Sequence, residues 1–255
     1  MTFDPCIQSL VDRGALFVVN HSGGKDSQAM LLHVRRHVPA SQILVIHAHL
    51  PEVEWAGTIE HIKATIDDLP FIVAQARKTF FEMVDHRRMW PSPATRQCTS
   101  DLKRGPIERE IRRYLADHPE FGGLVVNCMG LRAAESVGRA KKDAFKLNKR
   151  NSVAGREWYD WLPIHALHTL QVFAAIAVAG QRPHWAYQEG MTRLSCVFCI
   201  MASESDLKTA AKLNPELARR YAAKERELNH TMSMPANGQR RFLDEIVGDE
   251  LRAAA

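Results

Sequence analysis

An apolar segment that runs directly into a glycine-containing polar turn constrains this chain more than any other feature. Residues Leu16–Asn20 read Leu-Phe-Val-Val-Asn, a short apolar run that is typical of a buried strand. The turn Ser22-Gly-Gly-Lys-Asp-Ser27 follows, and the apolar residues of 28–34 then recur at helical spacing. The sequence therefore predicts a strand, a tight loop and a helix in succession.

The same alternation continues along the chain. Further strands are expected at 43–47, 71–74 and 124–127, and further helices at 58–69, 107–115 and 170–179. Such alternation is typical of an α/β fold, so we expect a Rossmann-like parallel sheet with helices on both faces. A helical C-terminal segment should follow, with a helix break at Asn214-Pro215 and a loop at Met232–Gln239 before a last short helix.

No linker divides the chain clearly by composition. We therefore expect one nucleotide-binding domain over residues 1–203 that carries the cysteines, with residues 204–255 as a helical extension of the same unit. The first ten residues lack a basic start followed by an apolar run, and no apolar stretch approaches the roughly 20 residues of a membrane span. These features favour a cytoplasmic protein without a membrane partner.

The predicted loop has the composition of a phosphate-binding site. Gly23 and Gly24 permit close approach of a ligand, the amides at the helix start face an anion, and Lys25 adds a positive charge. The serines at both ends offer hydroxyls, while Asp26 would cap backbone amides or help to hold a divalent cation. A tight turn beside an exposed lysine is the alternative. The pattern G-x-x-x-x-G-K-[ST] is absent, which disfavours kinase-like and GTPase-like functions.

Three segments together resemble one superfamily. Ser22–Ser27 resembles the PP-loop of ATP pyrophosphatases, which cleave ATP between its α and β phosphates. His47–Glu54 and Gly130–Ser136, the latter reading Gly-Leu-Arg-Ala-Ala-Glu-Ser, resemble segments of phosphoadenosine phosphosulfate (PAPS) reductase-like proteins. The resemblance covers Phe17–Met201 and implies an adenine nucleotide α-hydrolase-like fold.

This resemblance implies a nucleotide site that uses ATP with Mg²⁺. Lys25, Asp26 and Arg132 are the expected catalytic residues. The guanidinium of Arg132 offers paired donors to phosphate oxygens, although it would alternatively form a surface ion pair with Glu135. His49 stands where many relatives have Asp. The expected ATP-binding residues are Ser22, Gly23, Gly24, Lys25, Asp26, Ser27, His49, Arg132, Glu135 and Ser136.

The spacing of the cysteines predicts a metal or redox site. Five cysteines, an odd number, argue against a disulfide framework. Cys196-Val-Phe-Cys199 is a C-x-x-C pair, which suits an iron–sulfur cluster, a zinc site completed by His, or a redox dithiol. Cys128 follows an apolar strand and is expected in the core, and Cys6 has no partner by spacing.

The resemblance favours an iron–sulfur cluster, with zinc as the alternative. The segment 96–106, which holds Cys98, resembles a family element in which a cysteine pair precedes a lysine and a proline. In relatives with a [4Fe–4S] cluster, that pair joins a downstream C-x-x-C. Gln97 stands here in place of the first cysteine, so Cys98, Cys196 and Cys199 would leave one iron open, bound by another ligand, or available to substrate sulfur.

Charge and aromatic residues leave the partner open. The formal charge of +5 permits a polyanionic partner, and residues 139–150 concentrate six basic residues against the single acid Asp143. That segment would attract phosphate, or would be a solvated surface loop. Three tryptophans and two tyrosines either stack on bases or, more often, fill a core; they are Trp158, Tyr159, Trp161, Trp185 and Tyr187.

No cysteine follows Cys199, whereas the PAPS reductases that the chain resembles take up the sulfite group on a late cysteine. The resemblance therefore favours a relative that activates a target with ATP before sulfur delivery, as in DNA phosphorothioation of the Dnd and Ssp type. Thiolation of tRNA, sulfonucleotide reduction and a nucleic-acid-binding module without turnover are the alternatives. The expected partners are a sulfur donor such as a cysteine desulfurase, DNA ahead of tRNA, and a second copy of the chain.

Overall fold

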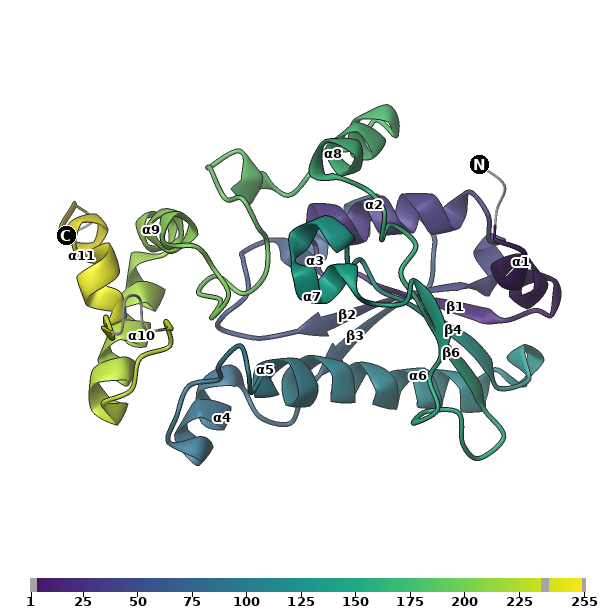
Figure 1. Ribbon diagram of the computed structural model, residues 1–255, viewed down its shortest axis with the longest axis horizontal. Helices are drawn as coiled ribbons and strands as arrows, with labels where there is room; N and C mark the ends of the chain where they lie inside the picture. Colours follow the sequence, from purple (N-terminus) through teal and green to yellow (C-terminus); the bar gives the residue numbers. More distant parts are fainter. Residues whose placement is uncertain (1–3, 235–238, 254–255) are drawn as a thin grey trace. The chain divides into compact units, whose positions relative to one another are not determined.

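A six-stranded sheet is the central element of the computed structural model, which describes residues 4–234 and 239–253 (Figure 1). The strands run in the order β3-β2-β1-β4-β6-β5. Strand β1 is parallel to β2 and β4, and β4 is parallel to β6, whereas the edge strand β5 is antiparallel to β6. The strands are β1 (Leu16–Asn20), β2 (Ile43–His49), β3 (Phe71–Gln75), β4 (Leu124–Cys128), β5 (Phe145–Leu147) and β6 (Glu157–Trp161).

Helices alternate with these strands and then dominate the C-terminal part. They are α1 (Pro5–Asp12), α2 (Lys25–Arg35), α3 (Thr58–Ile66), α4 (Phe80–Arg87), α5 (Gln97–Thr99), α6 (Gly105–Asp117), α7 (Val137–Ala140), α8 (Thr169–Val178), α9 (Glu204–Leu213), α10 (Pro215–Leu228) and α11 (Leu243–Ala253). The α/β fold with a mostly parallel sheet and C-terminal helices is therefore confirmed. Of the loop that we expected at 232–239, residues 235–238 lie outside the described residues. Among the described residues, no helix combines the length and apolar character needed to cross a membrane.

The chain divides into two compact units, each assembled from separate stretches of sequence. The first unit takes the described residues of 1–48, 58–74 and 107–184, and it contains the sheet. The second unit takes residues 49–57, 75–106 and the described residues of 185–255. The glycine loop therefore belongs to the first unit, and Cys98, Cys196 and Cys199 all belong to the second.

The core of the first unit lies on both faces of the sheet. Side chains of β1 alternate between the faces, as they must in any strand. Phe17 and Val19 pack with buried residues of α1, α2, α3 and α8, whereas Leu16 and Val18 pack with Ile111 and other residues of α6. Figure 1 shows α2 and α8 on one side of the sheet and α6 on the other. The expected helices on both faces are confirmed.

Strands β5 and β6 were not predicted from the sequence. Strand β6 carries polar residues between its tryptophans, and β5 is a short edge strand inside the basic segment 139–150, so neither has the apolar run of a buried strand. Trp158 and Trp161 are buried and belong to the core on the two faces of the sheet. Trp185 keeps 40% of its surface exposed.

The second unit is held together by helix packing and by an aromatic cluster. Helices α9, α10 and α11 pack against one another, and the break between α9 and α10 falls at Asn214-Pro215, as predicted. Pro215 occupies the first turn of α10, where its missing N–H costs no hydrogen bond. The aromatic cluster consists of Phe80, Phe81, Trp90, Phe198 and Tyr221, whose rings pack mutually with centroids 5.0 to 6.4 Å apart.

Candidate nucleotide and cysteine sites

The glycine loop joins the carboxyl end of β1 to the first turn of α2. The N–H of His21 donates to the Ile46 carbonyl at 2.8 Å, which ties the start of the loop to β2. Gly23 has a φ of 77°, a left-handed conformation that glycine adopts without strain. Gly24 is the N-cap of α2 and provides no side-chain cap, so the first amides of the helix face the loop as an anion site.

The two serines of the loop have different environments. The Ser27 hydroxyl accepts from the Ser22 N–H at 3.1 Å and donates to the Gly24 carbonyl at 2.8 Å, so it braces the loop from inside. Ser22 is exposed, and its own hydroxyl lies 3.3 Å from that of Ser27. Ser27 therefore fixes the loop backbone, while Ser22 is the serine that a ligand reaches.

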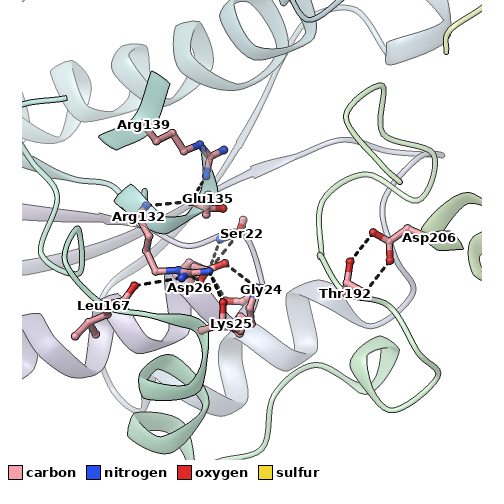
Figure 2. A network of polar contacts seen from close by, with 12 residues as sticks. Ser22, Gly24, Lys25, Asp26, Arg132, Glu135, Arg139, Leu167, Thr192 and Asp206 are labelled. Atoms are coloured by element: carbon pink, nitrogen blue, oxygen red, sulfur yellow. Dashed lines mark hydrogen bonds and ion pairs between the residues drawn. The ribbon is translucent and has the colours of Figure 1, made fainter. Parts of the chain in front are cut away.

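Lys25, Asp26 and Arg132, the three predicted catalytic residues, meet in one ionic group (Figure 2). Asp26 Oδ1 accepts from Arg132 Nε at 2.6 Å, and Asp26 Oδ2 lies 3.0 Å from Lys25 Nζ. The side chains of Lys25 and Arg132 are only 5% and 3% exposed, against 20% for Asp26. We expected Asp26 to cap amides or hold a cation such as Mg²⁺, but its two oxygens instead bind two cationic side chains.

Arg132 is fixed at both ends of its guanidinium. Besides the bond to Asp26, its terminal nitrogens donate to the Leu167 carbonyl at 3.2 Å and to the Thr169 hydroxyl at 3.3 Å. The side chain of Arg132 does not form the surface ion pair with Glu135 that was the alternative. Glu135 Oε2 instead accepts from the Arg132 backbone N–H at 2.9 Å. Arg132 therefore anchors Asp26 within the first unit.

The segment that follows β4 packs directly on the start of α2. A Cβ added to Gly130 would lie 3.1 Å from both the carbonyl carbon and the carbonyl oxygen of Asp26, so any other residue would require the Asp26 backbone to shift by a few tenths of an ångström. Glu135 pairs with Arg139, and the Ser136 hydroxyl accepts from the Arg139 N–H at 3.2 Å. In this structure Glu135 and Ser136 stabilise the turn that presents Arg132.

His21 was not among the predicted site residues, although it directly precedes the loop. Its Nδ1 accepts from the Gly23 N–H at 3.1 Å, which places the ring proton on Nε2. Burial, with smaller contributions from the nearby His47 and His61, lowers the pKa of His21 to about 3. A neutral His21 thus supports the left-handed Gly23 turn.

A ladder of polar side chains lies near the carboxyl ends of the central strands, and it too was not predicted. Asn20 of β1 donates to Asn127 Oδ1 of β4 at 2.7 Å, and Asn127 donates to Asp160 Oδ1 of β6 at 3.0 Å. Asn148 donates to the other oxygen of Asp160 at 2.9 Å. These bonds fix the strand ends from which the loop emerges.

The three predicted metal ligands are half-buried and lie on two segments of the second unit. Cys98 sits in α5, and a π-helical turn at Ser100–Arg104 follows it, a distortion that is frequent at functional sites. Cys196 and Cys199 flank Phe198 of the aromatic cluster. The sulfur of Cys199 accepts from the Met201 N–H at 3.4 Å, the kind of contact that stabilises a metal-bound thiolate.

The charges of these residues show that the cysteines share one environment. Burial raises the pKa of Cys98, and it raises the pKa of Cys196 to about 11, while Lys103 opposes both shifts. The pKa of Lys103 is itself raised, chiefly by Cys196 and also by Cys199 and Cys98. The three thiols and the ammonium of Lys103 therefore interact electrostatically, and their role as metal ligands stays a prediction. Lys103 lies in the segment 96–106 but was not among the predicted site residues.

The remaining predicted residues have local roles. His49 Nδ1 lies 2.7 Å from Glu54 Oε2, and both residues belong to the second unit, whereas the glycine loop belongs to the first. Cys128 is fully buried in the core, where burial raises its pKa well above the usual value, and Cys6 is exposed.

Known proteins resemble this chain in sequence and fold. The model of the family described as the phosphoadenosine phosphosulfate reductase domain matches residues 17–202. The chain is 28% identical over 148 residues to an uncharacterized 37.8 kDa protein of Escherichia phage 186, a match that covers 58% of this chain and 42% of that protein.

Two solved structures illustrate the likeness of fold. The PAPS reductase of Candida auris, in its phosphate complex, matches with a TM-score of 0.50 and 12% identity, over 74% of this chain and 87% of that one. The FMN adenylyltransferase of Candida glabrata, with FAD and inorganic pyrophosphate, matches with a TM-score of 0.47 and 13% identity, over 72% and 55%. The chain thus spans less than half of the phage protein and about half of the adenylyltransferase.

Proposed function

Because the chain belongs to the phosphoadenosine phosphosulfate reductase domain family, we propose that it binds ATP at the glycine loop and cleaves it between the α and β phosphates. The cleavage would adenylate a target in a sulfur-transfer pathway, with DNA phosphorothioation as the best-supported case. The observation that carries this proposal is the loop itself, where a left-handed Gly23, a helix start without a side-chain cap and Lys25 converge at the end of β1.

The residues of the glycine loop have different roles in binding the triphosphate. The amides of the first turn of α2 bind phosphate oxygens, and the exposed hydroxyl of Ser22 adds a donor. Lys25 exchanges its contact with Asp26 for one with the departing pyrophosphate, whose negative charge grows as the bond breaks. Arg132 is a positioning residue that keeps Asp26, and through it Lys25, in place before ATP arrives.

The chemistry follows from this arrangement. An oxygen of the acceptor attacks the α-phosphorus, the bond to the bridging oxygen of the β-phosphate breaks, and pyrophosphate leaves with its Mg²⁺. The acceptor oxygen now carries AMP and has become a leaving group. The terminal sulfur of the donor persulfide then forms a bond to the acceptor, and AMP departs with that oxygen. A thiol reductant cleaves the remaining S–S bond, so that one ATP, one donor sulfur and two electrons are consumed.

The cysteines support a sulfur pathway. Cys98, Cys196 and Cys199 would hold an iron–sulfur cluster, or zinc if a histidine completes the set, and a bound cluster would supply an iron at which sulfur can be held.

A polyanionic acceptor fits the charge of the first unit. Lys141, Lys142, Lys146 and Lys149 are all exposed on or beside β5. Exposed lysines grouped in this way attract a phosphate backbone at low salt. DNA is therefore the proposed acceptor and tRNA the alternative, with a cysteine desulfurase as the sulfur donor.

The test joins all components under anaerobic conditions: protein, Mg²⁺-ATP, a cysteine desulfurase with cysteine, a thiol reductant, and either duplex DNA or tRNA. Mass spectrometry of the digested nucleic acid should detect sulfur in the DNA, and Lys25→Ala should abolish it. Lys63→Ala, which removes an exposed lysine on α3, should leave it intact. Sulfur in tRNA alone would replace DNA by tRNA as the acceptor. Sulfur in neither, together with no pyrophosphate release, would refute the proposal.

A further inference from the structure

The hydroxyl of Tyr221 is buried and has no hydrogen-bond partner among the described residues. Tyr221 lies on α10 and is 0% exposed. Folded proteins rarely retain a buried hydroxyl without a partner, because such a group loses its bonds to water and regains none. The position therefore needs a reason for tyrosine rather than phenylalanine.

Packing does not supply that reason. The ring of Tyr221 stacks on Trp90 at 5.2 Å and lies 5.0 Å from Phe81 and 5.1 Å from Phe198, all measured between centroids. Each of these contacts uses the ring alone, so phenylalanine would make them equally well. The hydroxyl must serve something other than the aromatic cluster.

The surroundings of the hydroxyl point to the cysteines. Phe198, which packs on the Tyr221 ring, stands between Cys196 and Cys199 in the chain. Burial raises the pKa of Tyr221 well above its ordinary value, and Cys196, Cys199 and Cys98 each raise it further. The three cysteines thus affect the same hydroxyl, and in the part of the chain that the structure describes no carboxylate or carbonyl accepts its proton.

We propose that the Tyr221 hydroxyl donates a hydrogen bond to the group held by Cys98, Cys196 and Cys199. The hydrogen-bond acceptor that Tyr221 lacks is then an atom of that group. The proposal rests on the iron–sulfur cluster of the proposed function. Tyr221 is a positioning residue for the cluster and not a ligand. Hydrogen bonds to cluster sulfurs stabilise the more negative, reduced state and therefore raise the reduction potential.

The test uses the full chain with Tyr221→Phe, and with Tyr159→Phe as the matched control. Tyr159 also loses a hydroxyl, but one that donates to Glu157 in the first unit. Both variants and the wild type are reconstituted anaerobically with iron and sulfide. Three quantities are measured: thermal stability without metal, the reduction midpoint followed by electron paramagnetic resonance, and the rate of iron release to a chelator.

Tyr221→Phe should be at least as stable as the wild type without metal, because it removes an unsatisfied buried hydroxyl. With the cluster loaded, its midpoint should shift to more negative potential and iron release should be about tenfold faster, the factor expected for one hydrogen bond to a charged group. Tyr159→Phe should match the wild type in midpoint and iron release.

The outcomes separate the two proposals. If the wild type takes up the cluster and Tyr221→Phe matches it in midpoint and iron release, the role of Tyr221 is refuted while the cluster stands. If the wild type takes up no iron and sulfide, the cluster of the proposed function is refuted, and the role of Tyr221 with it.

Discussion

Replacing Asp26 by Asn tests the ionic group beneath the glycine loop. The carboxylate of Asp26 lies between Arg132 Nε at 2.6 Å and Lys25 Nζ at 3.0 Å. Asparagine keeps the shape but offers a single oxygen acceptor, and it would turn its NH₂ group toward the other cation. The variant therefore leaves two buried positive charges without the anion between them.

The cost follows from burial. Removing one partner of a buried ion pair lowers the free energy of unfolding by about 3 to 5 kcal/mol. Because the side chain of Asp26 is 20% exposed, we expect a loss of about 3 kcal/mol for Asp26→Asn. For a protein of this size, that loss lowers the melting temperature by about 6 to 12 °C. Asp85→Asn is the matched control, since Asp85 also pairs with a lysine, Lys224 at 2.8 Å, but is 49% exposed. Its loss should cost about 1 kcal/mol at most.

Pyrophosphate should separate stability from ligand binding in the same variant. In the wild type Lys25 must leave Asp26 to meet a phosphate, whereas in Asp26→Asn this competition is absent. Saturating pyrophosphate, followed by differential scanning calorimetry, should therefore raise the melting temperature of Asp26→Asn more than that of the wild type. The reasoning is refuted if Asp26→Asn costs no more than Asp85→Asn, or if pyrophosphate stabilises the wild type equally.

Three further predictions concern the loop and the cysteines. Gly130→Ala should cost about 1 to 3 kcal/mol because its Cβ would meet the Asp26 backbone, whereas Gly138→Ala, with open space around it, should be neutral in the same urea titration. His21 stays neutral when folded because its pKa is about 3, whereas the unfolded chain takes up a proton near 6.5. Stability should therefore fall as the pH drops from about 6.5 toward 3, by at most about 1.4 kcal/mol per unit, and His21→Asn should flatten that slope. Cys98→Ser should abolish iron binding in elemental analysis, whereas Cys6→Ser should retain it.

The spacing of apolar residues predicts those strands and helices whose pattern lies within the element itself. Strand β1 matches its predicted bounds, because its apolar run lies in adjacent residues. Helix α2 was predicted from residue 28 but begins at Lys25, inside the predicted turn Ser22–Ser27. Strands β5 and β6 escape prediction, because neither has a regular alternation of buried and exposed residues.

The candidate sites, too, are predictable only where their residues lie close together in the sequence. The residues of the glycine loop and the C-x-x-C pair are evident in the sequence, but their partners are distant in it. Arg132 finds Asp26 rather than its neighbour Glu135, because β4 and β1 lie side by side in the sheet. Tyr221 packs beside Phe198 through the tertiary contacts of α10, which no spacing rule anticipates.

The products formed from ATP test the central claim most directly. The protein is incubated with Mg²⁺ and ATP radiolabelled at the α-phosphate, with and without DNA, and the products are separated by chromatography. Cleavage at the loop predicts pyrophosphate, with the label in AMP or on the acceptor, and predicts that Lys25→Ala abolishes both while Lys63→Ala does not. Label in ADP, with release of inorganic phosphate, would mean cleavage between the β and γ phosphates and would contradict the account.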